Sequence, residues 1–241
     1  GTFMDAAKGQ AVIVPGIGPG FGRSKEMGCI ARSLDVAGVM IMPVVGPASN
    51  QGVFNGLKII AEETKLPSVL YQRRLDIMPI DDVVRLCEID YIIGLKYSVD
   101  DIVSFRELVD GASDRVAMVC GMAEDPCIEY MENGAIGFSS GMGNFVPRMS
   151  LMLLNKFQSG DLKEAKRLRE LMLPFEGFRG ERGARYSTSA LHSAMDCFGL
   201  SGGPVIPFSE DVASGDLHRV KGMMKVLGKE EKKLKEENKD V

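Results

Sequence analysis

Lys96 is the residue of this chain best suited to covalent chemistry. It closes a short apolar segment, Tyr91-Ile92-Ile93-Gly94-Leu95-Lys96, so its amine stands where the interior of a fold should begin. Burial disfavours the charged ammonium, and the free amine can attack a carbonyl carbon to form a Schiff base. The alternative is that the Lys96 stem only covers apolar surface while its amine reaches water. The elements around Lys96 decide between these two roles.

Tyr71 is the candidate partner of Lys96. It ends an apolar run, residues 68–71, that precedes the run of Lys96 along the chain. In a parallel barrel the carboxyl ends of successive strands face one pocket, so the phenol can lie near the amine. A phenol beside a cationic imine can donate a proton and take one back, which makes Tyr71 the candidate proton relay. Its alternative role is that of a pocket-lining aromatic residue whose hydroxyl finds one hydrogen-bond partner.

The chain alternates strand-like and helix-like segments as far as Phe138. Runs that are apolar on both faces and alternate with helices are typical of parallel strands in an α/β barrel or a doubly wound sheet. The six predicted strands are residues 11–14, 39–42, 68–71, 91–96, 116–120 and 135–138. The helices between them are predicted at 24–37, 51–63, 79–88, 98–110 and 125–133, the fourth beginning with a capping box of Ser98 and Asp101.

Beyond Phe138 the pattern is helical. Its periodicity predicts helices at 146–158, 161–176, 185–198 and 215–227. We therefore expect a barrel portion in residues 1–148, a helical region in 149–227, and a charged tail in 228–241 that is a frayed, solvated helix or disordered. An eight-stranded barrel needs eight strand–helix units. Six units thus predict a TIM-type barrel that is incomplete here, with two units or roughly 60 residues upstream of Gly1, unless the sheet is a shorter, open one.

The composition narrows the classes of partner and compartment. Among 241 residues, Lys and Arg total 29 against 33 for Asp and Glu, and this mildly acidic balance gives no reason to expect nucleic acid. No apolar stretch approaches the ~20 residues of a membrane helix. The five cysteines form no CxxC pair and the two histidines lack metal-ligand spacing, which argues against a disulfide framework and a metal site. We expect a cytoplasmic protein that binds neither nucleic acid nor membrane.

Four motifs together resemble the dihydrodipicolinate synthase and N-acetylneuraminate lyase family. They are similar to that family's third, fifth, sixth and eighth strands, in its order and spacing: Ala11-Val12-Ile13-Val14-Pro15-Gly16-Ile17-Gly18, Leu66-Pro67-Ser68-Val69-Leu70-Tyr71, Ile93-Gly94-Leu95-Lys96, and Gly134-Ala135-Ile136-Gly137-Phe138-Ser139 with Asn144 and Pro147. The resemblance implies an eight-stranded barrel with a helical C-terminal region, without cofactor or metal. It also implies a homotetramer built as a dimer of dimers.

The resemblance also implies a site and an activity. Lys96 would form a Schiff base with pyruvate or another 2-keto acid, and Tyr71 would relay protons. Further residues would contact the substrate: Gly137, Phe138 and Ser139 at the pocket floor, and Arg73 or its neighbour Arg74 at a carboxylate. The segment Tyr71-Gln72-Arg73 is similar to the Tyr-Asn-Arg of sugar-acid dehydratases. We therefore expect a class I lyase of aldolase, synthase or dehydratase type.

Two departures from the family pattern leave a second interpretation open. The family's Gly-Thr-Thr-Gly-Glu segment, whose threonines help to bind the keto-acid carboxylate and relay protons, does not occur in this sequence. Many members also carry tyrosines where Val44 and Val45 follow Pro43. The alternative to a lyase is therefore a non-catalytic, barrel-derived ligand-binding or regulatory protein that kept Lys96 but lost the relay.

Overall fold

A computed structural model describes residues 2–44 and 46–237 of the chain. These residues fall into two compact units. The first runs to Gly121 and includes Glu129–Phe138, and the second consists of Met122–Ile128 and the residues from Ser139 onward.

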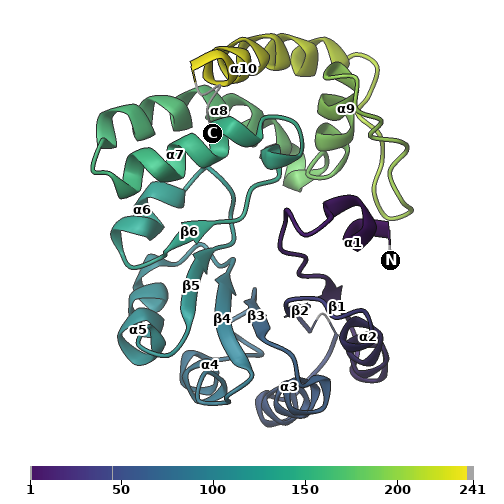
Figure 1. Ribbon diagram of the computed structural model, residues 1–241, viewed down its shortest axis with the longest axis vertical. Helices are drawn as coiled ribbons and strands as arrows, with labels where there is room; N and C mark the ends of the chain where they lie inside the picture. Colours follow the sequence, from purple (N-terminus) through teal and green to yellow (C-terminus); the bar gives the residue numbers. More distant parts are fainter. Residues whose placement is uncertain (1, 45, 238–241) are drawn as a thin grey trace. The chain divides into compact units, whose positions relative to one another are not determined.

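Six parallel strands form one sheet in the first unit (Figure 1). They are β1 (Gly16–Ile17), β2 (Val39–Ile41), β3 (Ser68–Gln72), β4 (Ile92–Tyr97), β5 (Ala117–Cys120) and β6 (Gly137–Phe138). Their order in the sheet is their order in the chain. A doubly wound sheet would reverse its strand order at a switch point, whereas a continuous order is that of a strand–helix barrel.

Helices α2 (Phe21–Ser33), α3 (Asn50–Thr64), α4 (Ile80–Leu86) and α5 (Ile102–Ala112) cover one face of this sheet (Figure 1). The short helix α1 (Thr2–Ala7) has no buried residue, and α6 (Cys127–Glu132) has residues in both units. Four strand side chains on the helix-covered face, Ile41, Leu70, Leu95 and Met118, are at most 1% exposed. Because side chains alternate along a strand, the residues between them, including Met40, Val69 and Lys96, face the opposite side, where they are half-buried.

The first strand lies later in the chain than predicted. Residues 11–14 were expected to form it, but the structure places β1 at Gly16–Ile17, and Val12 and Val14 are exposed. The reason is register: Gly16 lies opposite Met40 and Ile17 opposite Ile41. Since β2 begins at Val39, residues 11–14 have no segment of β2 with which to pair. The other five predicted strands are confirmed, with ends shifted by one or two residues.

The predicted capping box at Ser98 is wrong. The helix α5 begins at Ile102, and its cap is Asp101, whose carboxylate accepts hydrogen bonds from the backbone N–H groups of Val103 (3.0 Å) and Ser104 (3.1 Å). Ser98 still follows the strand ladder, because its backbone N–H donates to the carbonyl of Gln72 on β3 at 2.9 Å. The loop between Lys96 and α5 is therefore longer than the sequence pattern indicates.

The second unit is helical, as predicted. It contains the short 3-10 helix η1 (Met142–Asn144) and the helices α7 (Pro147–Gln158), α8 (Leu162–Ala184), α9 (Ser189–Cys197) and α10 (Leu217–Glu237). The helix α8 continues past the predicted end at residue 176 and carries non-helical backbone at residues 181–183 near its end. In the part of the chain that the structure describes, no helix is both long and apolar enough to cross a bilayer.

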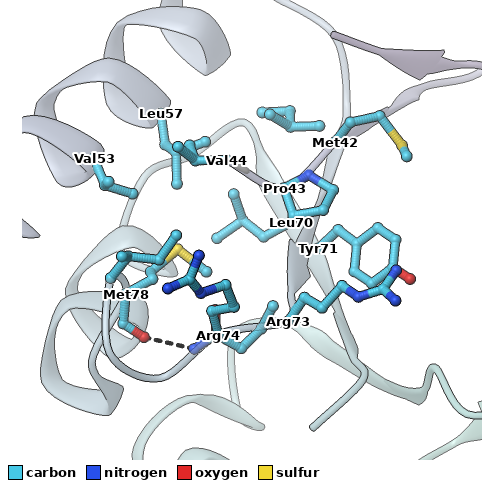
Figure 2. Close-up of a pocket in the computed structure, with 13 residues that line it drawn as sticks. Met42, Pro43, Val44, Val53, Leu57, Leu70, Tyr71, Arg73, Arg74 and Met78 are labelled. Carbon is cyan, nitrogen blue, oxygen red and sulfur yellow. Dashed lines mark hydrogen bonds between the residues drawn. The ribbon is translucent and has the colours of Figure 1, made fainter. Parts of the chain in front are cut away.

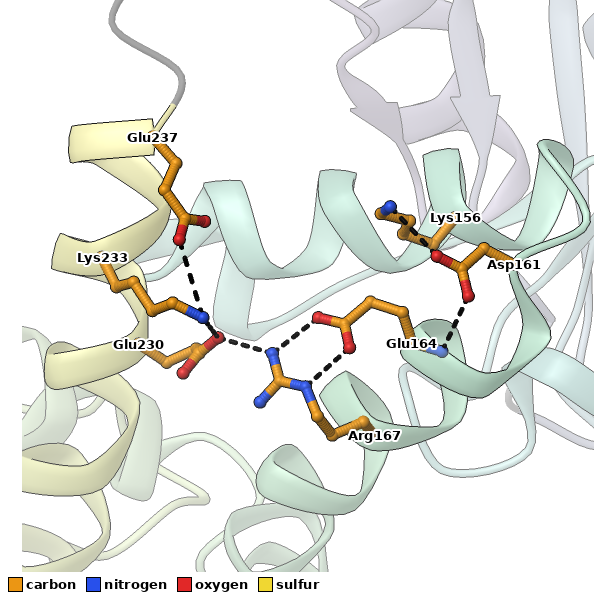
Figure 3. A network of polar contacts seen from close by, with 7 residues as sticks. All are labelled: Lys156, Asp161, Glu164, Arg167, Glu230, Lys233 and Glu237. Atoms are coloured by element: carbon orange, nitrogen blue, oxygen red, sulfur yellow. Dashed lines mark hydrogen bonds and ion pairs between the residues drawn. The ribbon is translucent and has the colours of Figure 1, made fainter.

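The tail was predicted to be a frayed, solvated helix or disordered, and the structure confirms a helix over residues 228–237, which continue α10. This helix is not solvated on all sides, because Glu231 and Leu234 are buried. Figure 3 shows the ion pair that joins α10 to α8, in which Arg167 contacts Glu230 at 2.6 Å. Arg167 also pairs with Glu164 within α8 at 2.7 Å. The tail residues 238–241 lie outside the described residues.

Candidate active site

Lys96 and Tyr71 occupy matching positions on neighbouring strands. Tyr71 of β3 lies opposite Lys96 of β4, and Lys96 lies opposite Val119 of β5. Residues opposite each other in a parallel pair point to the same face of the sheet. Both side chains therefore lie on the half-buried face, near the carboxyl ends of their strands, where barrel enzymes place their chemistry.

The amine of Lys96 lies against the ring of Tyr71. Its Nζ is 4.2 Å from the ring centroid, which is the geometry of a cation–π contact. Both side chains are half-buried. The structure thus brings the two residues into direct contact, while their catalytic roles stay predictions.

The environment of Tyr71 favours its ionisation. Burial acts to raise the pKa of Tyr71, but the Ser98 side chain and the charges of Lys96 and Arg73 outweigh burial, so the pKa of the phenol lies below its ordinary value. A phenol with a lowered pKa gives up its proton more readily at neutral pH. The site therefore contains a primary amine next to an acid–base group, as imine chemistry requires.

Two other tyrosines near Lys96 have the opposite character. Burial raises the pKa of Tyr97 above its ordinary value and that of Tyr130 to about 12. Tyr97 donates to the carbonyl of Asp101 (3.1 Å), and Tyr130 donates to that of Val99 (2.8 Å). These neutral phenols brace the loop that follows Lys96, so they serve structure while Tyr71 is available for chemistry.

Arg73 and Arg74, predicted as alternatives, have different surroundings. Arg74 forms a bidentate pair with Asp76, with distances of 3.0 and 2.5 Å. Arg73 has no ion pair or side-chain hydrogen bond with any described residue, and Figure 2 shows it extending toward the hydroxyl end of Tyr71 while Arg74 turns toward Met78. Arg73 is therefore the arginine with donors available for a substrate carboxylate.

The space behind Tyr71 on the helix side is filled. It is lined mainly by apolar side chains, among them Val44, Val53, Leu57 and Leu70, and has a free volume of about 10 Å³ (Figure 2). Such a volume holds one water molecule at most. This space therefore has no room for a keto acid. Val45, the second residue of the predicted departure from the family pattern, lies outside the described residues.

The predicted pocket-floor residues fall into both units. Gly137 is buried on β6 and lies opposite Val119, so it extends the row of Tyr71, Lys96 and Val119 across the sheet. Phe138 follows it and is half-buried. Ser139 belongs to the second unit. Of the three, Gly137 and Phe138 share the sheet of Lys96.

The sequence interpretation missed Gly121 and the hydroxyl of Ser98. A Cβ on Gly121 would lie 1.9 Å from Ser98 Oγ and 2.9 Å from Lys96 Cγ, so only glycine fits beside the lysine stem. The signal was present, since a glycine directly after a strand often marks a close approach. Ser98 could not be identified in this way, because its sequence context indicates a helix cap.

The model of a protein family described as "Dihydrodipicolinate synthetase family" matches residues 2–216. Curated relatives include two proteins named "Probable 5-dehydro-4-deoxyglucarate dehydratase". The one from Bacillus subtilis is 26% identical over 202 residues, covering 82% of this chain and 65% of the relative. The one from Saccharopolyspora erythraea is 29% identical over 231 residues, covering 94% of this chain and 74% of the relative. The chain therefore spans just under two thirds of the length of the first of these relatives.

Solved structures share the fold. Dihydrodipicolinate synthase from Oceanobacillus iheyensis matches with a TM-score of 0.88 and 26% identity over 94% of this chain and 76% of its own. Dihydrodipicolinate synthase from Bacillus clausii matches with a TM-score of 0.87 and 25% identity, covering 92% of this chain and 76% of the synthase chain. These matches confirm the predicted α/β barrel class with a helical C-terminal region.

Proposed function

The chain belongs to the dihydrodipicolinate synthetase family, and from this premise we propose that it is a class I lyase acting on a 2-keto acid through a Schiff base on Lys96. The observation that carries the proposal is the contact between the Lys96 amine and the Tyr71 ring, 4.2 Å from Nζ to centroid. The lowered pKa of Tyr71 supports it, because a nucleophilic amine needs a nearby group that moves protons.

The chemistry follows from these two groups. The free amine of Lys96 attacks the keto carbon, a C–N bond forms, and the resulting carbinolamine loses water to become an imine. The protonated imine withdraws electrons from the adjacent carbon, so that carbon can lose a proton or break a bond to its neighbour. Tyr71 donates a proton to the departing hydroxyl and takes one from the substrate, returning to its initial state.

We propose a dehydratase that acts on a deoxy keto sugar acid with a second carboxylate. Two curated relatives are named for 5-dehydro-4-deoxyglucarate, a substrate with carboxylates at both ends. Arg73 supplies a guanidinium that pairs with no described carboxylate and extends toward the phenol end of Tyr71. An arginine can bind a carboxylate through two parallel hydrogen bonds, which would orient the far end of such a substrate.

The experiment is borohydride trapping with pyruvate, followed by intact mass. We expect one added pyruvate-derived group per chain in the wild type and none in Lys96→Ala. The matched control is Lys58→Ala, because Lys58 lies on the surface of α3 in a loose pair with Glu62 at 3.8 Å. It should trap as much as the wild type.

Two results would reject the lyase. Either the wild type forms no adduct, or the adduct persists in Lys96→Ala. An adduct without turnover of any keto sugar acid would instead favour the non-catalytic binding protein, since such a protein keeps the lysine but lacks a complete proton relay. Turnover is measured by release of the dehydrated keto acid from 5-dehydro-4-deoxyglucarate, with pyruvate aldol products as the comparison.

A further inference from the structure

Ser98 has a buried hydroxyl without a hydrogen bond of standard geometry to any described residue. It stands two positions after Lys96 and continues the ladder beyond β4 through the bond from its N–H to the Gln72 carbonyl. Because side chains alternate along an extended segment, Ser98 and Lys96 point to the same side. A buried hydroxyl that lacks a partner is costly and uncommon, so its position needs an explanation.

The fold makes room for this hydroxyl. A Cβ on Gly121 would stand 1.9 Å from Ser98 Oγ and 2.9 Å from Lys96 Cγ, so both side chains lie against the bare backbone of that glycine. The N–H of Gly121 donates to the carbonyl of Tyr97 at 2.6 Å. Because Tyr97 stands between Lys96 and Ser98 in the chain, this bond holds the glycine against both residues. The Ser98 hydroxyl is therefore held beside the Lys96 stem by rigid backbone.

The loop on the other side of Ser98 is fixed as well. Tyr130 accepts a hydrogen bond from the N–H of Asp101 (3.2 Å) and donates to the carbonyl of Val99 (2.8 Å). The ring of Tyr97 packs 5.3 Å from that of Phe105, centroid to centroid. The backbone on both sides of Ser98 is therefore fixed. A side chain can orient a neighbouring group only if its own position is fixed in this way.

The register of the sheet places Tyr71 next to this hydroxyl. Tyr71 lies opposite Lys96, two residues before Ser98, and its ring contacts the Lys96 amine, while the Ser98 N–H bonds to Gln72, the residue after Tyr71. The interaction of the Ser98 side chain with the phenol favours the ionised form of Tyr71, together with the charges of Lys96 and Arg73. A hydroxyl that donates to a phenolate makes a charge-assisted hydrogen bond, which is shorter and stronger than one to a neutral phenol. Ionisation of Tyr71 would therefore draw the two oxygens together and give Ser98 Oγ its missing partner.

We propose that Ser98 is a positioning residue, whose hydroxyl donates a hydrogen bond to ionised Tyr71 and so prepares that phenolate to accept a proton. In the transfer, the proton leaves the substrate and bonds to the Tyr71 oxygen, while Ser98 keeps its own proton throughout. The consequence for turnover rests on the proposed function. The link between Ser98 and Tyr71 does not, because it is a property of the protein without substrate.

The first test is a spectroscopic titration of tyrosinate in the full chain. Subtracting the curve of Tyr71→Phe isolates the signal of Tyr71. We expect Ser98→Ala to raise the pKa of Tyr71 by about one pH unit or more, since a hydrogen bond to a charged group is lost. Ser98→Thr, which keeps the hydroxyl, should restore the wild-type titration.

The control is Ser68→Ala, which removes a buried hydroxyl on β3 that donates to the Leu66 carbonyl at 2.9 Å. This variant should leave the titration of Tyr71 unchanged. An unchanged titration in Ser98→Ala, or a shift equally large in Ser68→Ala, would overturn the proposal. Failure of Ser98→Thr to restore the wild-type curve while folding normally by circular dichroism would do the same.

The second test is the pH profile of turnover. In Ser98→Ala, the rising limb of the plot of turnover rate against pH, which reports deprotonation of Tyr71, should move to higher pH. Borohydride trapping should still add one pyruvate-derived group per chain at Lys96. A merely structural role would lower the rate at every pH without moving the limb. If the wild type forms no pyruvate adduct, the proposed function fails, yet the titration still decides the role of Ser98.

Discussion

At the scale of single residues, one side-chain type has opposite chemistry at nearby positions. Tyr97 and Tyr130 lie among apolar neighbours and donate to carbonyls, so burial keeps them protonated. Tyr71 is also half-buried, but it lies beside the Lys96 side chain, the Arg73 guanidinium and the Ser98 hydroxyl. The charged and polar groups around each tyrosine therefore decide which phenol can exchange protons. The surroundings also distinguish the two arginines that follow Tyr71, because Arg74 is paired with Asp76.

Replacing Arg73 by Ala should weaken the binding of a two-carboxylate keto acid. The loss of a charge-assisted pair raises KM roughly tenfold or more, whereas pyruvate trapping on Lys96 should change little because pyruvate has no second carboxylate. The matched control is Arg74→Ala, since Arg74 is already paired with Asp76. Steady-state kinetics with both substrates checks this, and equal effects of the two variants would contradict it.

Replacing Gly121 by Ala should disturb the site from the backbone. The new Cβ would meet the Tyr97 carbonyl at 2.7 Å as well as Ser98 Oγ and the Lys96 stem, and the carbonyl has little room to move. We expect a loss of about 1–3 kcal/mol in the free energy of unfolding and less trapping on Lys96. Gly22→Ala is the control, because Gly22 lies on α2 with open space around it and alanine favours helix. Equal denaturant midpoints for the two variants would refute this account.

At the scale of elements, the strands were predictable and their loops were not. The apolar runs that end in Tyr71 and Lys96 identify β3 and β4, because their composition is local information. Ser98 was assigned to a helix cap from an equally local pattern, but a bond to Gln72 on another strand keeps it in the ladder. Contacts between segments far apart in the sequence determine such positions. Local patterns in a single sequence do not predict those contacts.

The end of α10 is a second case of the same kind. Its Lys and Glu blocks are typical of a solvated segment, yet the buried carboxylate of Glu231 accepts hydrogen bonds from the backbone N–H groups of Arg148 (3.2 Å) and Met149 (3.0 Å). These groups open α7, whose own N-cap, Val146, has no side chain that can accept. Glu231 therefore caps α7 through Arg148, which lies 83 residues earlier in the chain.

Glu231→Ala should destabilise the protein because it removes this distant cap. Loss of an N-cap typically costs about 1–2 kcal/mol in the free energy of unfolding, and the change also removes the ion pair with Arg148. Glu236→Ala, an exposed position on the same helix in a loose pair with Lys232 at 3.9 Å, should change the free energy of unfolding by much less. Urea unfolding of both variants measures the difference, and similar midpoints would show that the cap contributes nothing.

At the scale of the whole molecule, family membership follows from a match over residues 2–216, while the resemblance also implies a homotetramer. The tetramer stays a prediction. Sedimentation velocity over a range of protein concentrations checks it: we expect a main species with four times the mass of one chain. A species with the mass of one chain at every concentration would contradict it.

Stability should also depend on pH through one buried carboxyl group that the sequence did not reveal. Glu124 is fully buried and accepts hydrogen bonds through Oε1 from Ser140 and from Ser150 (2.9 Å), while its Oε2 has no partner among the described residues. Burial raises the pKa of Glu124 to about 7 despite these bonds, and the charge of Glu176 acts in the same direction. The folded protein therefore holds a proton between pH 4.5, the ordinary pKa of the group, and about 7, where the unfolded chain has lost it.

Because the folded state binds the extra proton, the free energy of unfolding should fall as the pH rises through this window, by as much as about 3 kcal/mol. Glu124→Gln, which is neutral at every pH, should remove this part of the slope, so the variant gains on the wild type at pH 8 relative to pH 5. Glu170→Gln is the control, since Glu170 is an exposed carboxylate on α8 and should leave the slope unchanged. Urea unfolding at a series of pH values measures all three proteins. If the wild type and Glu124→Gln lose stability in parallel between pH 5 and 8, the pKa of Glu124 is not raised in the folded protein, and this account is wrong.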